Sequence, residues 1–256
     1  MLHLAIPVRD EAPTIGVLLW RIRQVLREFS REFQVVVYDD GSTDATREVL
    51  APYHEVMPLT VLGHREPRGY AHALDTLLRH VATTGRYARR DAMILMQGDL
   101  TDRPEDLPEL VKRFEGGADC VGAARARDLA APVAVQRLAR VGPWVLKPFV
   151  SLPAALDPFG TYRALRVSVV KDLVREAGEA PVVRGEGWAA NVDLLLATAR
   201  HTRRLEAVTL ARRWDLRPRP TRVRPWPDAL ALFRYGRGAR RRPAPAAGVP
   251  APAAAR

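Results

Sequence analysis

The chain has 256 residues, a formal net charge of +11 and 47% hydrophobic residues, which is enough to bury a sizeable core. Its single cysteine, Cys120, excludes an internal disulfide and a cysteine-based zinc cluster. No apolar run approaches the roughly 20 residues that a membrane-spanning helix needs, and the N-terminus lacks a signal-peptide pattern, so a cytoplasmic location is expected.

The first half of the chain alternates strand and helix patterns. Apolar runs predict strands, and apolar residues at helical spacing predict helices. The expected strands are 2–8, 35–38, 59–62, 92–96 and 118–123, and the expected helices are 15–29, 44–50, 70–81 and 105–114. This alternation predicts an α/β fold with a mostly parallel sheet and helices on both faces.

The second half is less regular. A helix broken by prolines is expected at 133–152, a turn entering a strand or an edge segment at 157–164, a helix at 189–200 and a strand at 205–210. Beyond a folded domain over 1–222, residues 223–242 form a basic amphipathic segment. The Pro/Ala tail 243–256 cannot build a core and is expected to be disordered.

Positive charge is concentrated near the C-terminus. Residues 203–242 hold thirteen arginines and three acids, which accounts for +10 of the net charge. Such a segment predicts an anionic partner: a diphosphate, an anionic membrane surface or nucleic acid. Stacking aromatics are too few among the arginines for a nucleic-acid binder to be favoured.

Two acidic turns follow apolar strands about 60 residues apart. The first carries Asp39 and Asp40 and the second carries Asp99. Because ligands gather beyond the carboxyl ends of strands in open α/β sheets, both turns are expected to belong to one nucleotide-diphosphate site. Asp39 and Asp40 could bind a base and a ribose, or they could simply cap a turn. Asp99 could ligate Mg²⁺ or Mn²⁺, since Asp102 is the better-placed N-cap for the following helix.

Phosphate binding has to be achieved without the common glycine-rich loops, because neither Gly-x-Gly-x-x-Gly after a strand nor a Walker A motif occurs. A divalent cation, arginines or both would have to bind the phosphates. Arg68 and Gly69 precede a helix, and the glycine would let a ligand approach the backbone there, although a simple loop is an equally good interpretation.

Several of these segments resemble the family 2 inverting glycosyltransferases, in particular the dolichol-phosphate mannose synthases and related polyprenyl-phosphate sugar synthases. The resemblance covers residues 2–222. The matching segments are IPVRDE at 6–11 (family I-P-x-x-N-E), VYDDGSTD at 37–44 (V-D-D-G-S-x-D), RGYAHAL at 68–74 (G-x-x-x-A), QGDLTDRPEDLP at 97–108 (D-A-D-L-Q-H-x-P-E-D-L-P), DPFGTYR at 157–163 (D-x-x-S-G-F-R) and GWAANVDLL at 187–195 (G-Y-x-F-x-x-E-L-L).

The resemblance implies a GT-A fold over residues 1–222 and a nucleotide-sugar donor, with UDP and GDP both open. Pro7, Glu11 and Asp40 match positions that hold the nucleoside, with Asp39 beside them. Asp99 matches the second acid of the metal motif, and Thr101 takes the place of a glutamine that faces the metal.

Gln97 is the main departure, because it replaces the first acid of the metal motif. The loss of one carboxylate is expected to weaken Mg²⁺ or Mn²⁺ binding, and Asp102 is the candidate to compensate for it. In the related synthases an arginine at the position of Arg137 contacts the acceptor phosphate. Arg217 and Arg222 match a basic loop that closes on the donor phosphates, but prolines replace its glycine.

The expected reaction is sugar transfer with inversion to a polyprenyl phosphate, which is already an anionic nucleophile and needs no general base. Asp99, Arg137 and Asp193 are the candidate catalytic residues, and Asp193 would act as base if the acceptor were a hydroxyl. Transfer to a soluble or glycan hydroxyl is one alternative. A nucleotide-sugar-binding protein without catalysis, suggested by Gln97, is the other.

Membrane association is a separate expectation. Trp226, Leu230 and Phe233 form an apolar cluster flanked by arginines, and such a stretch can lie on an anionic bilayer or dock onto the domain. Peripheral association with the inner face of the cell membrane is therefore expected as an alternative to a purely cytoplasmic location.

Overall fold

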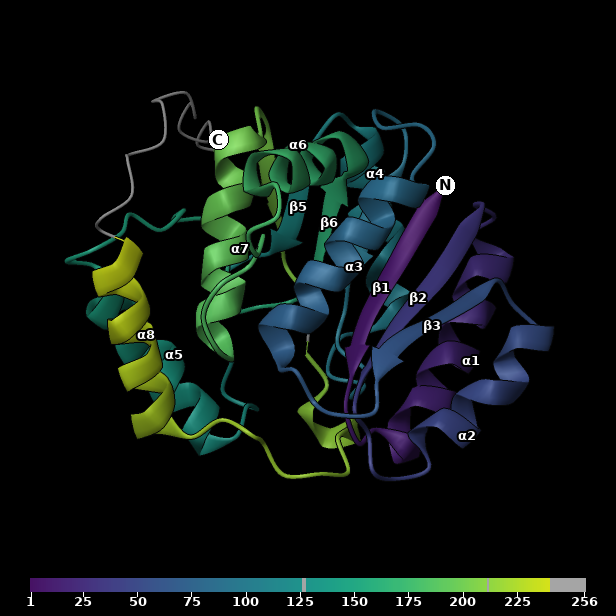
Figure 1. Cartoon of the computed structure of the whole chain (residues 1–256), viewed down its shortest axis with the longest axis horizontal. Helices are drawn as coiled ribbons and strands as arrows, with labels where there is room; N and C mark the ends of the chain where they lie inside the picture. Colours follow the sequence, from purple (N-terminus) through teal and green to yellow (C-terminus); the bar gives the residue numbers. More distant parts are fainter. Residues whose placement is uncertain (126–127, 211, 240–256) are drawn as a thin grey trace.

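The computed structural model describes residues 1–125, 128–210 and 212–239. A seven-stranded sheet runs through it in the order β3-β2-β1-β4-β6-β5-β7 (Figure 1). The strands are β1 (Leu2–Val8), β2 (Phe33–Asp40), β3 (Leu59–His64), β4 (Ala92–Leu95), β5 (Cys120–Ala123), β6 (Arg163–Arg166) and β7 (Leu205–Val208).

Most neighbouring strands of the sheet are parallel, as the sequence predicts. The pairs β3–β2, β2–β1, β1–β4 and β5–β7 are parallel, whereas β6 is antiparallel to both β4 and β5. The segment 157–164 enters a strand, as one of the two expected alternatives has it, but the edge alternative is wrong, because β6 lies inside the sheet. Its residues Arg163, Ala164 and Leu165 are buried, so the strand needs partners on both sides.

Helices cover both faces of the sheet. One face packs against α1 (Ala12–Glu28) and α4 (Leu107–Glu115), and the other against α3 (Tyr70–Thr84), α6 (Val167–Ala177) and α7 (Trp188–His201). In α1 the apolar residues recur at helical spacing and are buried, and Pro13 stands in the first turn, where its missing N–H costs nothing. The short α2 (Thr46–Leu50) and the 3-10 helices Ala51–Glu55, Pro104–Asp106 and Trp214–Leu216 complete the connections.

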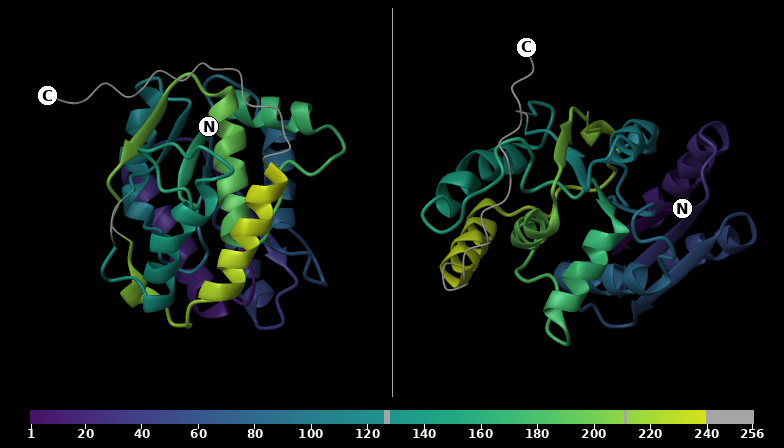
Figure 2. Two further views of the ribbon diagram at one scale, coloured as in Figure 1. Left: turned by 90° about the vertical axis from the view of Figure 1, so that its left-hand side faces the viewer. Right: turned by 90° about the horizontal axis from the view of Figure 1, so that it is seen from above.

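The helices α5 (Val133–Leu146) and α8 (Pro225–Ala239) pack side by side and against α7 around a third apolar cluster (Figure 2). The helix predicted over 133–152 ends at Leu146, although Pro143 is accommodated within it. Helix α8 lies in the basic segment predicted for 223–242. Residues 240–242 and the predicted tail 243–256 lie outside the described residues. Within the described ranges, no helix combines the length and the apolar character needed to cross a bilayer.

Candidate active site

The predicted acidic residues follow three neighbouring parallel strands. Strand β2 ends at Asp40, Glu11 follows β1, and Asp99 follows β4, while the sheet order places β1 between β2 and β4. The carboxyl ends of parallel strands meet at one edge of a sheet, which is where ligands bind in this class of fold. The structure therefore brings these three carboxylates to the same edge, as the sequence predicts.

Asp39 and Asp40 use their carboxylates to fix the loops beside them. Asp39 is fully buried, accepts a hydrogen bond from the Ser42 backbone N–H at 2.9 Å and pairs with Arg47. Asp40 accepts hydrogen bonds from the backbone N–H groups of Arg68 and Gly69, at 2.6 and 3.0 Å. The Asp39 carboxylate is thus bonded within the turn and helix that follow it. The Asp40 carboxylate instead contacts residues 68–69, which the sequence assigns to the site.

Gly69 opens a space beside Asp40. Its φ is +94°, which favours glycine, and a Cβ added there would meet no atom within 4 Å. The residue immediately precedes α3, so the helix presents backbone N–H groups at this point. This geometry fits the predicted approach of a ligand to the backbone at Arg68 and Gly69.

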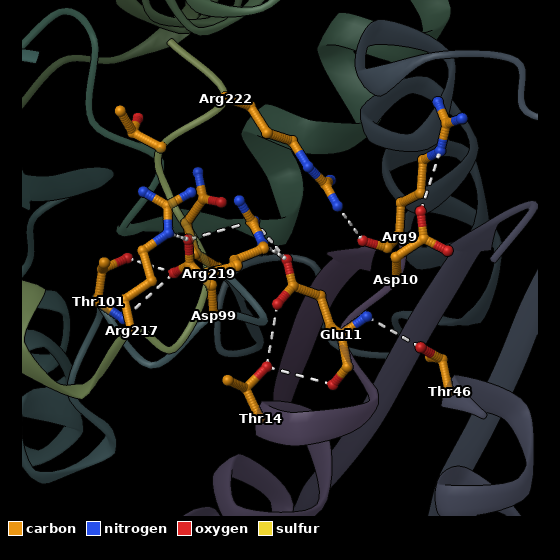
Figure 3. Close-up of polar contacts among 12 residues, drawn as sticks. Arg9, Asp10, Glu11, Thr14, Thr46, Asp99, Thr101, Arg217, Arg219 and Arg222 are labelled. Atoms are coloured by element: carbon orange, nitrogen blue, oxygen red, sulfur yellow. Dashed lines mark hydrogen bonds and ion pairs between the residues drawn. The ribbon is translucent and has the colours of Figure 1, made fainter. Parts of the chain in front are cut away.

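Glu11 is a buried carboxylate at the start of α1, next to the buried Pro7 of β1. One of its oxygens accepts a hydrogen bond from the Thr14 hydroxyl at 3.0 Å, and the other pairs with the guanidinium of Arg219 (Figure 3). Its backbone N–H donates to the Thr46 hydroxyl at 2.9 Å. Both backbone and side chain of Glu11 are therefore held, and the carboxylate faces the arginine segment.

Asp99 is buried and divides its two oxygens between different partners. Oδ1 accepts hydrogen bonds from the backbone N–H and the hydroxyl of Thr101. Oδ2 lies 3.1 Å from Arg217 Nε and 3.5 Å from Arg219 Nη2 (Figure 3). The turn between them holds Leu100 at φ +66°, an uncommon conformation for leucine that costs energy and is often found at functional sites.

A segment that we call the arginine strap, residues 217–222, supplies the cations of this site. Its side chains Arg217 and Arg219 reach Asp99, and Arg222 donates a hydrogen bond to the Arg9 carbonyl at 2.6 Å. Burial lowers the pKa values of Arg217 and Arg222, and in each case a neighbouring arginine lowers the pKa further. The sequence analysis named Arg217 and Arg222 but missed Arg219, although the alternation Arg-Pro-Arg-Pro places residues 217 and 219 on the same side of an extended segment.

Gln97 occupies the position of the missing acid and turns away from Asp99. Its side-chain Nε2 donates to the Thr161 hydroxyl at 2.7 Å, and its backbone N–H donates to Asp102 at 2.9 Å. The prediction that Asp102 caps the next helix is wrong, since the helical turn begins at Pro104 without a side-chain cap. Burial raises the pKa of Asp102 to about 7, against the opposing effect of Arg212. A carboxyl that carries only part of its charge near neutral pH compensates poorly for the lost acid.

Thr161 connects the acidic turns to the second half of the chain. Its hydroxyl lies 2.9 Å from the Tyr70 hydroxyl, which itself donates to Asn191 at 2.9 Å. Burial raises the pKa of Tyr70 to about 12, so its proton is retained. These three residues could not be assigned from the sequence, because their hydrogen bonds join positions that are 30 to 121 residues apart.

An arginine-lined cavity of about 540 Å³ lies beside α5. Arg137 lines it from α5, and the stacked rings of Phe159 and Trp188, 4.7 Å apart, form part of its wall. The other charged and apolar groups of the lining include Arg125, Asp128, Leu129, Val133, Arg140, Asp157 and Arg212. The cavity thus offers both guanidinium groups and apolar surface.

The register of β6 places this cavity at the same edge of the sheet as the acidic residues. Arg163, at the start of β6, pairs with Leu95 at the end of β4 and with Gly122 near the end of β5. The residues that precede β6 and those that follow β5 therefore lie beyond the carboxyl end of β4. These are the segments that carry Asp157, Phe159 and Arg125 into the cavity.

The side chain of Asp193 accepts hydrogen bonds from α8 and from the loop before α7. It is buried in α7, where it accepts hydrogen bonds from the Tyr235 hydroxyl at 2.9 Å and from the Arg184 backbone N–H at 2.8 Å. These contacts tie α7 to α8 and to the loop before α7. The predicted role of Asp193 as a base stays a prediction.

The residues at Asp99 fit a resident divalent cation poorly. Asp99 and Thr101 would contribute one carboxylate and one hydroxyl, and two guanidinium groups already face Oδ2. Magnesium is usually bound by one or two carboxylates together with substrate phosphates. A single carboxylate is therefore the smallest number of carboxylate ligands that such a site normally has. Across residues 1–125, 128–210 and 212–239, no group of three or more His, Cys, Asp or Glu side chains could hold a metal ion.

Comparison with known proteins adds a family and a set of relatives. The model of the family described as Glycosyl transferase family 2 matches residues 4–174. The chain is 32% identical over 127 residues to an undecaprenyl-phosphate 4-deoxy-4-formamido-L-arabinose transferase of Pseudomonas paraeruginosa, which covers 49% of this chain and 35% of the relative. The counterpart from Photorhabdus laumondii is 28% identical over 123 residues, covering 48% and 36%. The chain therefore spans about a third of the length of these relatives.

Solved structures resemble the chain over most of its length. The glucosyl-3-phosphoglycerate synthase of Mycobacterium tuberculosis, in complex with Mn²⁺, UDP and glucosyl-3-phosphoglycerate, has a TM-score of 0.61 and 20% identity, covering 91% of this chain and 76% of that one. A mannosyltransferase of Pyrobaculum calidifontis, in complex with GDP-Man and Mn²⁺, has a TM-score of 0.54 and 23% identity, covering 81% and 54%. These similarities confirm the predicted α/β fold of the GT-A type.

Proposed function

The chain belongs to family 2 of the glycosyltransferases, and on that premise we propose that this enzyme moves a sugar, with inversion, from a nucleotide-diphosphate donor to a polyprenyl phosphate. The observation that carries the proposal is the arrangement at one edge of the sheet. The acidic turns after β2, β1 and β4 and the arginine-lined cavity lie at the same edge, and the Gln97–Thr161 hydrogen bond links the turn after β4 to the segment that precedes β6.

The donor occupies the half formed by β2, β1 and β4. Its nucleoside, from UDP or GDP, lies against Pro7, Glu11 and Asp40, with the Arg68–Gly69 backbone beside it. Its diphosphate lies under the arginine strap. Guanidinium groups form charge-assisted hydrogen bonds to phosphate oxygens, often two at a time, so they suit this position.

The acceptor phosphate occupies the cavity, where Arg137 binds it and the apolar wall receives the first part of its hydrocarbon chain. In the reaction a phosphate oxygen attacks the anomeric carbon as the bond to the donor diphosphate breaks, and the nucleoside diphosphate leaves with the electron pair. No proton has to be removed from the nucleophile. The arginines neutralise the charge that develops on the leaving group.

Transfer to a soluble or glycan hydroxyl is the second candidate, and it requires a base. The burial of Asp193 between Tyr235 and the Arg184 backbone favours the phosphate acceptor over this candidate. The expectation of Mg²⁺ or Mn²⁺ at Asp99 and Thr101 stays a prediction: two neighbouring structures contain Mn²⁺, but the residues around Asp99 fit such an ion poorly.

Peripheral association at the inner face of the cell membrane is part of the proposal, because a polyprenyl phosphate is a membrane lipid. Exposed aromatic side chains support it: Trp144 of α5 is 73% exposed and Trp226 of α8 is 86% exposed. Lys147, Arg234 and Arg237 belong to the same pair of helices or their ends and provide charge for anionic headgroups.

The test is a transfer assay with undecaprenyl phosphate in detergent and UDP- or GDP-linked sugars. We expect a lipid-linked sugar as product, and we expect Arg137→Ala to lower transfer about tenfold or more while UDP or GDP binding stays unchanged. Arg175→Ala, which alters an exposed ion pair on α6, is the matched control. Transfer to hydroxyl acceptors alone, or donor binding without transfer or hydrolysis, would contradict the proposal.

A further inference from the structure

The inference concerns the cation that faces Asp99, and it rests on the proposed nucleotide-diphosphate donor. We propose that the guanidinium groups of Arg217 and Arg219 take the place of a divalent cation, so that the enzyme binds the diphosphate of its donor without a metal ion. The ligand class is a nucleoside diphosphate.

The first observation is the balance of charge around Asp99 and Glu11. Arg219 pairs with both carboxylates, and Arg217 shares the Asp99 oxygen with it. Arg222 and Arg9 add two guanidinium groups and Asp10 adds one carboxylate, so four cations face three carboxylates and one positive charge is left at the strand ends. A divalent ion on Asp99 Oδ2 would have to displace these groups or tolerate their repulsion, whereas a diphosphate is attracted by them.

The second observation is the identity of residue 97. A carboxylate at this position would add the negative charge that a divalent ion needs, but Gln97 is neutral. Its amide nitrogen is also directed to Thr161, at 2.7 Å, and not toward Asp99. The site therefore offers one carboxylate at the point where the family motif has two.

The third observation is that two buried N–H groups of the arginine strap form no hydrogen bond with the described residues. Arg219 Nη1 is buried and forms no hydrogen bond to any part of the chain that the structure describes, and Arg217 Nε, although it lies 3.1 Å from Asp99 Oδ2, forms no hydrogen bond either. Buried donors without an acceptor are costly and are normally satisfied, and phosphate oxygens would satisfy these. Pro218 and Pro220 restrict the backbone between the arginines, so less conformational freedom is lost when the ligand binds.

The experiment is calorimetric titration of the full chain with UDP and with GDP, once in EDTA and once with Mn²⁺ or Mg²⁺. We expect at least one nucleotide to bind in EDTA, with a Kd within about threefold of the value measured with metal. Binding that occurs only with metal would overturn this inference and leave the proposed donor intact. If neither nucleotide binds under any condition, the proposed function itself fails.

Two substitutions sharpen the test. Arg219→Gln is expected to raise the Kd in EDTA roughly 10- to 100-fold, because charge-assisted hydrogen bonds to the diphosphate are lost. Arg219→Lys keeps the charge but not the planar fork, and an intermediate Kd is expected. Arg213→Gln is the control, because Arg213 is an exposed arginine of the same region paired with Asp215. An unchanged Kd in both Arg219 variants, with thermal unfolding showing that they are folded, would overturn the inference.

Gln97→Asp tests the same inference from the opposite direction. The restored carboxylate would stand beside Asp99 and supply the missing charge for a divalent ion. We expect Mn²⁺ to tighten nucleotide binding by this variant about tenfold or more, while it changes wild-type binding less than about threefold. A wild-type protein that responds to Mn²⁺ as strongly as the variant does would contradict the proposal.

Discussion

His3 is a buried titratable residue away from the active site, and it should make the stability of the protein depend on pH. It is fully buried in β1, and neither ring nitrogen has a hydrogen-bond partner among the described residues. Burial lowers its pKa below the usual value, although Asp91 acts in the opposite sense; burial also lowers the pKa of His80 on α3. The folded protein therefore favours neutral rings.

As pH falls below about 6.5, the unfolded chain takes up protons at these histidines before the folded protein does, so the free energy of unfolding should decrease. The loss is complete below the folded-state pKa values. In His3→Leu this decrease should be smaller, as measured by urea unfolding between about pH 5 and 7. His54→Leu, at an exposed position, is the control, and identical pH dependence in the wild type and His3→Leu would disprove the role of His3.

At the active site, the residues that could be predicted are those preceded by an apolar run, because such a run indicates that a strand ends there. Asp40 and Asp99 each follow an apolar run, and their common sheet edge follows from the parallel topology, whereas Glu11 is expected only from the family resemblance. Arg219 and Thr161 could not be assigned in this way. Their roles depend on contacts with Glu11 and Gln97 across 208 and 64 positions, which no local pattern encodes.

The packing of α8 on the residues that follow α5 relies on close approach at a glycine. A Cβ on Gly236 would lie 2.6 Å from Phe149 Cδ2, whereas a Cβ on Gly238 would meet nothing within 4 Å. Gly236→Ala should therefore destabilise the protein by about 1–3 kcal/mol through overpacking, even though alanine favours a helix. Gly238→Ala is the matched control in the same helix and should be neutral or slightly stabilising. Equal thermal unfolding midpoints for the two variants would contradict this account of the packing.

The helices whose apolar residues recur at regular helical spacing could be predicted from the sequence. The elements whose position depends on pairing with distant strands could not. The periodicity of α1, α3 and α7 fixed their type and approximate ends. Strand β6 has only four residues, and its antiparallel place inside the sheet depends on partners at β4 and β5 that lie far away in sequence. Helix α6 follows β6 directly and was not predicted, since its apolar residues Val167, Val169 and Val170 do not distinguish a strand from a helix.

At the scale of the whole molecule, the exposed side chains of α5 and α8 predict how the enzyme meets a membrane. The wild-type protein should sediment with anionic vesicles at low salt and less well with neutral vesicles, because both apolar and cationic groups contribute. The double variant Trp144→Ser/Trp226→Ser should lose most of this binding. Trp20→Ser, an equally large change at an exposed site on α1, should not. Equal sedimentation with both kinds of vesicle would rule out the electrostatic contribution.

The position of β6 also has a consequence for synthesis of the chain on the ribosome. Strand β4 is complete at Leu95, but the neighbour that covers its outer side is not made until Arg166. Meanwhile β5 has no partner in the sheet, since both of its neighbours come later in the chain. A nascent polypeptide between these points exposes an open strand edge, the kind of surface that invites aggregation. Ribosome stalling or truncation before residue 163 should therefore yield an insoluble product, whereas release of the full-length chain should not.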